Sequence, residues 1–102
     1  MEQTALTETT YYILLSLYTP LPGYGIMQRA AELSGGRVRL AAGTLYGALN
    51  ALVEKGWITL LPGEGRKKEY KLTPKGLEIL KKELARLREL VASGDMVLKE
   101  EA

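Results

Sequence analysis

The side chains most able to recognise a partner lie in residues 40–58. Tyr46 and Asn50 are four residues apart, so on a helix they would project from one face, one turn from each other. Gly43 and Gly47 fall on the same face. Glycine inside a helix costs about 1 kcal/mol relative to alanine, so two glycines there favour close approach of a partner's backbone. Such a face fits a groove of DNA, in which an asparagine amide can pair with adenine.

These residues also have purely structural alternatives. Tyr46 could be a surface tyrosine packed on a neighbouring hairpin, and Asn50 could be a solvated polar residue. Thr44 lies near the expected start of the same helix, where a hydroxyl and free backbone N–H groups can meet a phosphate. The sequence therefore predicts DNA contacts from Thr44, Tyr46, Gly47 and Asn50.

A second group of candidate residues is the cation run Arg66, Lys67 and Lys68, which follows a Pro-Gly-Glu-Gly turn. Three adjacent cations repel one another unless an anion lies beside them. Residues 35–76 carry eight basic and three acidic side chains, although the net charge of the chain is only +2. This concentration is typical of a phosphate-binding surface. A solvated basic surface is the alternative.

Composition excludes most of the common catalytic and metal-binding chemistry. The 102 residues include no cysteine and no histidine, and Asp95 is the only aspartate. Disulfides, thiol redox sensors and Cys/His zinc sites are therefore excluded, and we expect no enzyme activity, metal or cofactor. The length points to one domain. The acidic, polar N-terminus and the lack of a long apolar run predict a cytoplasmic protein without a membrane span.

The elements that would position these residues can be read from the apolar pattern. Leu45, Leu49, Leu52 and Val53 form one stripe of a helix over about residues 42–55, which ends at Lys55-Gly56. Residues 57–61 and 66–72 then predict a β-hairpin. This order indicates a winged helix-turn-helix, mainly α with a small hairpin, in which the helix reads DNA and the hairpin is the wing.

Two further helices precede the recognition helix. Thr7 can cap a first helix that runs to about Tyr18, and two prolines follow it. Residues 23–34 read as a second helix, ended by Ser34-Gly-Gly36. Tyr24 and Gln28 on this helix are weaker candidates for DNA contact.

A long helix is expected after the hairpin. Thr73-Pro-Lys is a helix start, and the helix should end near Ala92, at Ser93-Gly-Asp95. Its apolar residues repeat as in a coiled-coil seam and predict a dimer contact made by Leu77, Leu80, Leu84, Leu87, Leu90 and Val91. Packing within one chain is the rival interpretation. The resulting organisation is a DNA-binding domain over 1–72, a dimerisation helix over 73–92 and a flexible tail over 93–102.

Several short segments resemble the PadR family of bacterial transcriptional regulators. The matching segments are Tyr12–Leu17, Gly23–Ile26, Leu40–Leu49, Leu52–Ile58, Arg66–Tyr70 and Leu72–Gly76. The single C-terminal helix resembles the short type of this family. The resemblance implies a winged-helix homodimer on a palindromic operator, usually a repressor, which in many members a small aromatic or drug-like compound releases from DNA. Some short members bind planar compounds between tryptophans of the C-terminal helix, but here that helix has no aromatic residue.

The leading hypothesis from the sequence is thus a sequence-specific, double-stranded-DNA-binding regulator. A winged-helix module that binds protein and not DNA is the alternative. The basic hairpin tip and the glycine-bearing helix argue against it, and a steep dependence of DNA binding on salt would separate the two.

Overall fold

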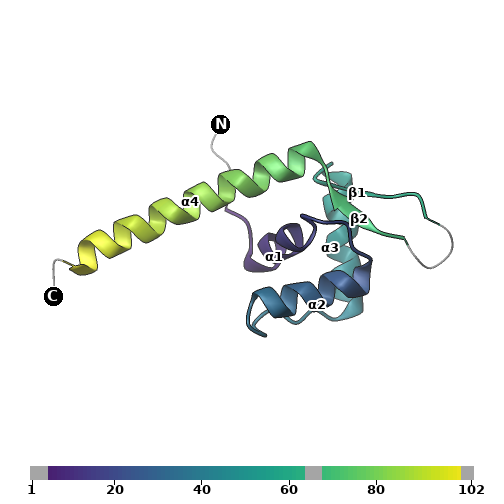
Figure 1. Cartoon of the computed structure of the whole chain (residues 1–102), viewed down its shortest axis with the longest axis horizontal. Helices are drawn as coiled ribbons and strands as arrows, with labels where there is room; N and C mark the ends of the chain where they lie inside the picture. The colour runs from purple at the N-terminus through teal and green to yellow at the C-terminus, as the bar shows by residue number, and fades with distance from the viewer. Residues whose placement is uncertain (1–4, 64–67, 100–102) are drawn as a thin grey trace.

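The structure is a computed structural model that describes residues 5–63 and 68–99. The elements follow one another as α1 (Glu8–Ser16), α2 (Gly23–Leu33), α3 (Ala42–Glu54), β1 (Ile58–Leu60), β2 (Tyr70–Leu72) and α4 (Pro74–Lys99). In Figure 1, α1 lies at the centre, with α2, α3 and α4 around it. The expected architecture, mainly helical with one small hairpin and a long C-terminal helix, is confirmed.

A single hydrophobic core joins all the helices. Ile13 and Leu14 of α1 are fully buried at its centre. The buried apolar side chains of this core are Ile13, Leu14, Leu17, Ile26, Leu45, Leu49, Leu52, Ile58 and Leu80. Since burying such a side chain stabilises the fold by about 1.5 to 3 kcal/mol, this cluster determines how α2 and α3 are held against α1.

The first helix begins as expected and ends early. The side chain of Thr7 accepts a hydrogen bond from the Thr10 N–H, at 3.1 Å. The helix stops at Ser16, with Leu17 as its cap, whereas the sequence predicted an end near Tyr18. Tyr18 lies outside the core and is exposed. A residue that contributes nothing to the core, two positions before a proline, has no reason to extend the helix.

The turn between α2 and α3 depends on two glycines with positive φ, Gly35 at 63° and Gly36 at 88°. The Gly36 N–H donates to the Ala31 carbonyl at 2.8 Å, and the Ser34 hydroxyl accepts from the Val38 N–H at 2.9 Å. These bonds end α2 and turn Val38 into the interior. The turn therefore sets how α3 follows α2.

The recognition helix predicted for residues 42–55 is α3, Ala42–Glu54. Leu45, Leu49 and Leu52 are buried, but Val53 is exposed, so the apolar stripe is narrower than predicted. Val53 lies about 100° around the helix from Leu52, so it falls outside the side of α3 that packs against the rest of the chain. Gly56, with φ of 78°, ends the helix.

The hairpin is shorter than predicted. β1 and β2 pair antiparallel in the register Ile58↔Leu72, Thr59↔Lys71 and Leu60↔Tyr70. Trp57 is not in the strand, because its N–H donates to the Leu52 carbonyl at 3.1 Å and closes the end of α3. By strand alternation Leu60 should share the inner face of Ile58, but it is exposed. At this end of the hairpin the core contact is made by Tyr70, the partner of Leu60 in the other strand.

The start of α4 is fastened to the end of α3. The Thr73 hydroxyl donates to the Gly56 carbonyl at 2.6 Å and accepts from the Gly76 N–H at 3.0 Å. A Cβ on Gly76 would overlap the carbonyl oxygen of Trp57. The expected Thr73 cap is thus present, and a glycine at position 76 lets α4 pack directly on the chain that follows α3.

The predicted end of α4, near Ala92, is wrong. The helix continues to Lys99, so Ser93-Gly-Asp95 does not end it and residues 93–99 are helical; 100–102 lie outside the described residues. Gly94 does not have the positive φ of a helix-terminating glycine. Within the described part of the chain, no helix, α4 included, is both long and apolar enough to cross a membrane.

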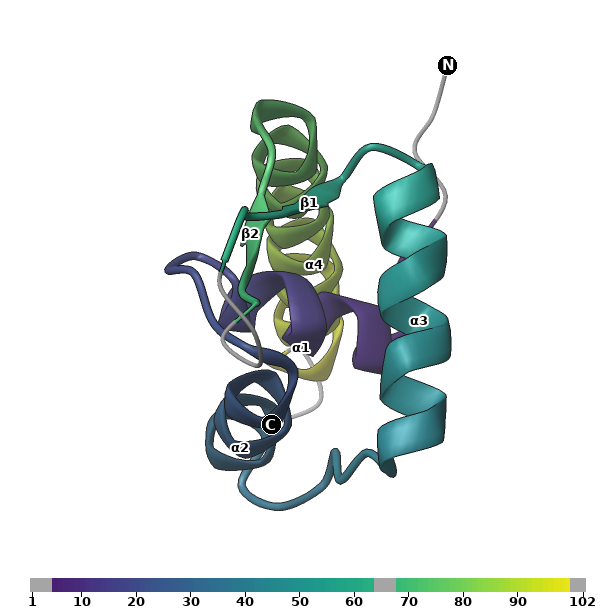
Figure 2. The same cartoon turned by 90° about the vertical axis from the view of Figure 1, so that its right-hand side faces the viewer.

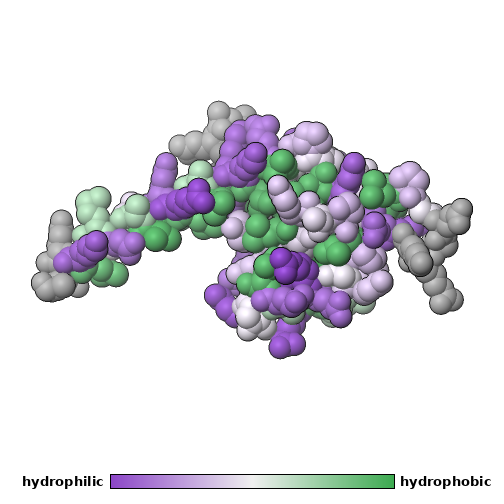
Figure 3. All heavy atoms as spheres, in the orientation of Figure 1, coloured by the Kyte–Doolittle hydropathy of each residue, from purple (hydrophilic) through white to green (hydrophobic). Residues whose placement is uncertain are grey.

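The predicted leucine seam divides into two parts. Leu80 is only 6% exposed and belongs to the core of its own chain, which corrects its assignment as a dimer contact. Leu77, Leu84 and Leu87 are half-buried. Leu90 and Val91 are 56% and 62% exposed on the part of α4 that projects beyond the body (Figures 1 and 3). Packing within the chain therefore accounts for the first half of the seam and not for the second.

Candidate nucleic-acid interface

The face of α3 predicted to contact DNA is open to solvent. Thr44, Tyr46, Gly47 and Asn50 are all exposed, while the opposite side of the helix carries the buried leucines. Figure 2 views this side of the molecule, with α3 upright, the two strands beside its upper part and α2 seen end-on below. The exposed face of α3, the hairpin and the start of α2 thus lie on one side of the molecule, away from the projecting end of α4 (Figures 1 and 2).

No neighbour within the described part of the chain requires glycine at positions 43 and 47. A Cβ built on either residue meets no atom of another element within 4 Å. Neither residue has a positive φ. These glycines therefore leave the exposed face of α3 without side chains at two positions. They lower helix stability, and no packing contact within the described chain compensates for this.

Tyr46 has a different environment from the rest of this face. Its side chain crosses to α2, where a Cβ on Gly23 would lie 2.8 Å from Tyr46 Cζ and would overlap the hydroxyl. The residue nevertheless keeps 45% of its surface exposed. The phenol thus rests on the first turn of α2, where backbone N–H groups lack helical acceptors and the cap residue Pro22 offers no side-chain hydrogen bond.

Tyr70 of the hairpin lies close to Tyr46. Burial raises the pKa of the Tyr70 phenol above its usual 10.0, and the neighbouring Tyr46 phenol raises it further. The structural alternative for Tyr46 was packing on the hairpin; the contact that the structure shows for its ring is with Gly23 at the start of α2. This contact does not remove Tyr46 from the surface.

The weaker candidates of α2 are also exposed. Tyr24 and Gln28, four residues apart, project into solvent from α2. The arginines of the following loop are engaged: Arg37 Nη2 lies 2.8 Å from Glu8 Oε2, and Arg39 Nε donates to the Gly36 carbonyl at 3.1 Å. Tyr24 and Gln28 are consequently the freer of these groups.

The predicted wing cations are partly described. Lys68 is exposed, whereas Arg66 and Lys67 lie outside the described residues. The base of the wing is fastened to the α1–α2 connection, because Leu21 and Tyr70 exchange two backbone hydrogen bonds, Tyr70 N to Leu21 O at 2.8 Å and Leu21 N to Tyr70 O at 3.1 Å. Lys71 is exposed on β2. Lys68 and Lys71 therefore extend positive charge along the hairpin.

A buried carboxylate on α4 was not found from the sequence. Glu83 is 1% exposed and accepts from the Leu6 N–H at 3.1 Å and from Arg86 at 2.7 and 2.8 Å. Hydrogen bonding to Glu83 raises the pKa of Arg86. In the sequence, the signal for this buried pair was an acidic residue within a leucine-rich helix face, followed three residues later by an arginine. The pair ties α4 to the segment before α1.

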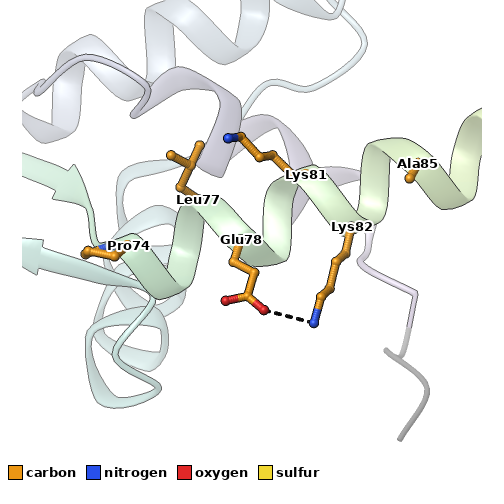
Figure 4. Close-up of a pocket in the computed structure, with 6 residues that line it drawn as sticks. All are labelled: Pro74, Leu77, Glu78, Lys81, Lys82 and Ala85. Atoms are coloured by element: carbon orange, nitrogen blue, oxygen red, sulfur yellow. Dashed lines mark ion pairs between the residues drawn. The ribbon is translucent and has the colours of Figure 1, made fainter.

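Shallow hollows border α4 and α3. One of 440 Å³ runs along the outer side of α4 (Figure 4), where Leu77 and Lys81 project to one side and Glu78 and Lys82, an ion pair of 3.0 Å, to the other. One of 260 Å³ lies between α1 and α4, beside Tyr11, Tyr12 and Arg86. Within residues 5–63 and 68–99, no cluster of acidic residues could hold a metal ion.

Trp57 borders a third hollow, of 240 Å³, between α3 and the segment before α1. Lys55 Nζ lies 4.7 Å from the centroid of its ring, a cation–π contact. Ala48 and Ala51 form the α3 side of this hollow. The tryptophan therefore belongs to the end of α3 and lies on a different element from the projecting helix.

Comparison with known proteins identifies a matching family. The model of the Transcriptional regulator PadR-like family matches residues 13–82, from α1 to the first part of α4. A stretch of 64 residues, 63% of the chain, is 42% identical to an uncharacterized 37.1 kDa protein in transposon Tn4556 of Streptomyces fradiae. The chain spans only 18% of that protein.

Three solved structures with this fold serve as comparisons. PadR of Bacillus subtilis, in complex with operator DNA, is 28% identical with a TM-score of 0.66, over 80% of this chain and 49% of that one. A PadR-like transcription factor from Bacteroides fragilis is 28% identical with a TM-score of 0.70, over 86% and 87%. RosR of H. salinarum is 25% identical with a TM-score of 0.68, over 90% and 96%.

Proposed function

This chain belongs to the PadR-like family of transcriptional regulators, and we propose that it is a homodimeric repressor that binds a specific operator in double-stranded DNA. The observation that carries this proposal is the open face of α3. Two glycines there cost helix stability without any neighbour in the described chain that requires them. A duplex whose base edges approach the helix backbone would require them.

Each exposed residue of this surface has a role in the proposed complex. Asn50 would pair with adenine in the major groove, and Gly47 would let α3 approach the base edges. Thr44 and Tyr46 would bind phosphates, since a hydroxyl beside free backbone N–H groups is a favourable phosphate site. Tyr24 and Gln28 would contact the flanking backbone. The wing cations Arg66, Lys67 and Lys68 would bind phosphates beyond the groove.

The proposed dimer uses the projecting part of α4. Large apolar side chains are exposed there without cover from the body: Leu90, Val91, Met96, Val97 and Leu98. A second copy packed on this surface would remove them from water, as the body already does in part for Leu84 and Leu87. A two-fold dimer would also present two recognition helices to the two halves of a palindrome.

Release from DNA by a small aromatic or drug-like compound would require a different site from tryptophans on the C-terminal helix, which this chain lacks. The hollow between α1 and α4 is the better candidate. Tyr11 and Tyr12 meet there edge to face, with ring centroids 5.6 Å apart, beside the partly exposed Arg86. A ligand in this hollow would touch both the centre of the body and the helix proposed to dimerise.

The test is a fluorescence-anisotropy titration against duplex DNA from the region upstream of the protein's own gene, at two salt concentrations, with a scrambled duplex as control. Tight binding of the native duplex, weakened by salt and abolished by the scramble, supports a sequence-specific regulator. Equal, weak binding of both duplexes would argue for a winged helix whose exposed apolar residues serve protein partners. Absence of binding at low salt would count against the wing assignment.

A further inference from the structure

The start of α2 meets the phenol of Tyr46, and the base of the wing is hydrogen-bonded to the chain just before it. Tyr46 belongs to the exposed face of α3. Gly23 opens α2 and is buried. Tyr70 belongs to the base of the wing. The proposed DNA surface is composed of the same three elements, so whatever holds them together also determines its shape.

Gly23 is required by its neighbour, unlike the glycines on α3. A Cβ at residue 23 would lie 2.8 Å from Tyr46 Cζ and 3.1 Å from Cε1, where Gly43 and Gly47 meet nothing within 4 Å. Its backbone has no positive φ, so conformation does not explain the glycine. The space that a side chain would occupy is filled by the Tyr46 ring. The contact therefore sets how closely α3 approaches the start of α2.

The wing is connected to the same place through its backbone. Tyr70 exchanges hydrogen bonds of 2.8 and 3.1 Å with Leu21, two residues before Gly23. The pKa of the Tyr70 phenol is raised first by burial and then by Tyr46, so the two phenols also interact electrostatically. A shift of Tyr46 would thus be felt at both α2 and the wing.

We propose that Gly23 is a positioning residue: it seats the Tyr46 phenol on the start of α2, which the Leu21–Tyr70 hydrogen bonds tie to the wing, and thereby presents the recognition helix and the wing to DNA as one rigid surface. The inference rests on the proposed DNA-binding function. Base readout depends on geometry, whereas non-specific phosphate attraction depends mainly on charge. A substitution that disturbs the contact between Gly23 and Tyr46 should consequently lower the preference for the operator over other DNA and leave charge-driven binding unchanged.

The first test is Gly23→Ala, measured well below its unfolding temperature. We expect affinity for the native duplex to fall about tenfold, the order expected when one base-specific hydrogen-bonded pair is removed, while affinity for a scrambled duplex changes by less than about twofold, because the charge is unchanged. Ala85→Ser is the matched control, since Ala85 is exposed on α4 away from the proposed DNA surface and the substitution changes no charge, and it should leave both affinities unchanged.

The second test asks whether Gly23 acts through Tyr46. In a Tyr46→Ala background the phenol is gone, so Gly23→Ala should no longer destabilise the protein; it should raise the unfolding temperature, because alanine is the better helix former. Unfolding measurements on the four proteins of this cycle need no DNA. Additive effects of the two substitutions would overturn the inference, because they would mean that the residues act independently.

The outcomes separate the inference from the function on which it rests. If the wild-type protein does not distinguish the native from the scrambled duplex, the proposed function fails and the inference fails with it. If the wild type does distinguish them and Gly23→Ala lowers both affinities equally, or neither, only the positioning role is overturned. A non-additive cycle together with a selective loss of specific binding supports both.

Discussion

The carboxylate of Glu83 accepts two hydrogen bonds from Arg86, at 2.7 and 2.8 Å, while it is almost completely buried between α4 and the segment before α1. The same carboxylate accepts the Leu6 N–H at 3.1 Å. Burial of a charge is costly unless its hydrogen bonds are satisfied. Glu83 therefore joins α4 to the rest of the molecule through polar contacts in an otherwise apolar face.

Glu83→Ala should lower the free energy of unfolding by about 2 to 3 kcal/mol, because it leaves the Leu6 N–H without this acceptor and opens a gap in the packing of α4. Urea denaturation followed by circular dichroism measures the change. Glu78→Ala is the control on the same helix: Glu78 forms an exposed pair with Lys82 at 3.0 Å, so its removal should cost less than about 1 kcal/mol. Equal effects of the two substitutions would contradict this role for Glu83.

Gly47→Ala should change stability and DNA affinity in opposite senses. The added methyl enters open space, so the free energy of unfolding should rise by up to about 1 kcal/mol. The same methyl would stand between α3 and the base edges and weaken operator binding. Thermal unfolding and anisotropy on one preparation test this. A variant that is more stable and binds as tightly as the wild type would show that the glycine does not serve DNA contact.

Replacing the wing cations should reduce the salt dependence of binding. In the triple variant Arg66→Ala, Lys67→Ala, Lys68→Ala, the slope of log K against log salt should fall by about 0.9 for each phosphate that the wing no longer binds. Anisotropy at several salt concentrations measures the slope. Lys81→Ala, on the outer side of α4 (Figure 4), removes a charge away from the hairpin and should leave the slope nearly unchanged. A slope unaffected by the triple change would remove the wing from the proposed complex.

Charges on the projecting part of α4 should dissociate the proposed dimer. Leu90 and Val91 are exposed in the single chain, so Leu90→Glu with Val91→Glu should leave the protomer folded and shift the mass in sedimentation velocity from two copies to one. Ala85→Glu serves as control, since residue 85 lies more than about 100° around the helix from both positions. Equal masses for the wild type and the double variant would exclude this surface as the interface.

Alkaline pH should destabilise the protein in part through Tyr70. Its pKa in the folded state is raised above 10.0, so between the two pKa values the unfolded chain releases a proton that the folded protein keeps. The free energy of unfolding therefore falls as the pH rises through this range, and the contribution is fully present below it. In Tyr70→Phe this part of the decline should vanish. Parallel curves of stability against pH for the two proteins would refute the assignment.

Local features were predictable because each depends on a few adjacent residues. Thr7 and Thr73 cap their helices, Gly56 ends α3, and Leu45 and Leu49 face inward, as their spacing and chemistry indicate. The exposure of the opposite face of α3, on which the candidate site depends, follows from the same periodicity. The fold class was likewise predictable from the sequence, and the lack of cysteine and histidine is a property of the sequence itself.

Other features depend on which segments cover one another, and periodicity does not contain that information. Leu80 and Val91, eleven residues apart, lie within about 20° of each other around the helix, yet the rest of the chain covers the first and not the second. Glu83 is buried because the segment before α1 crosses it, 77 residues away in the sequence. The contact of Tyr46 with Gly23 likewise exists only once α2 and α3 are packed. The sequence by itself determined that these helices and the hairpin form and which face of α3 is exposed as the proposed DNA surface; tertiary packing decided which apolar residues remain exposed and what holds that face in place, because both depend on contacts between segments that are distant along the chain.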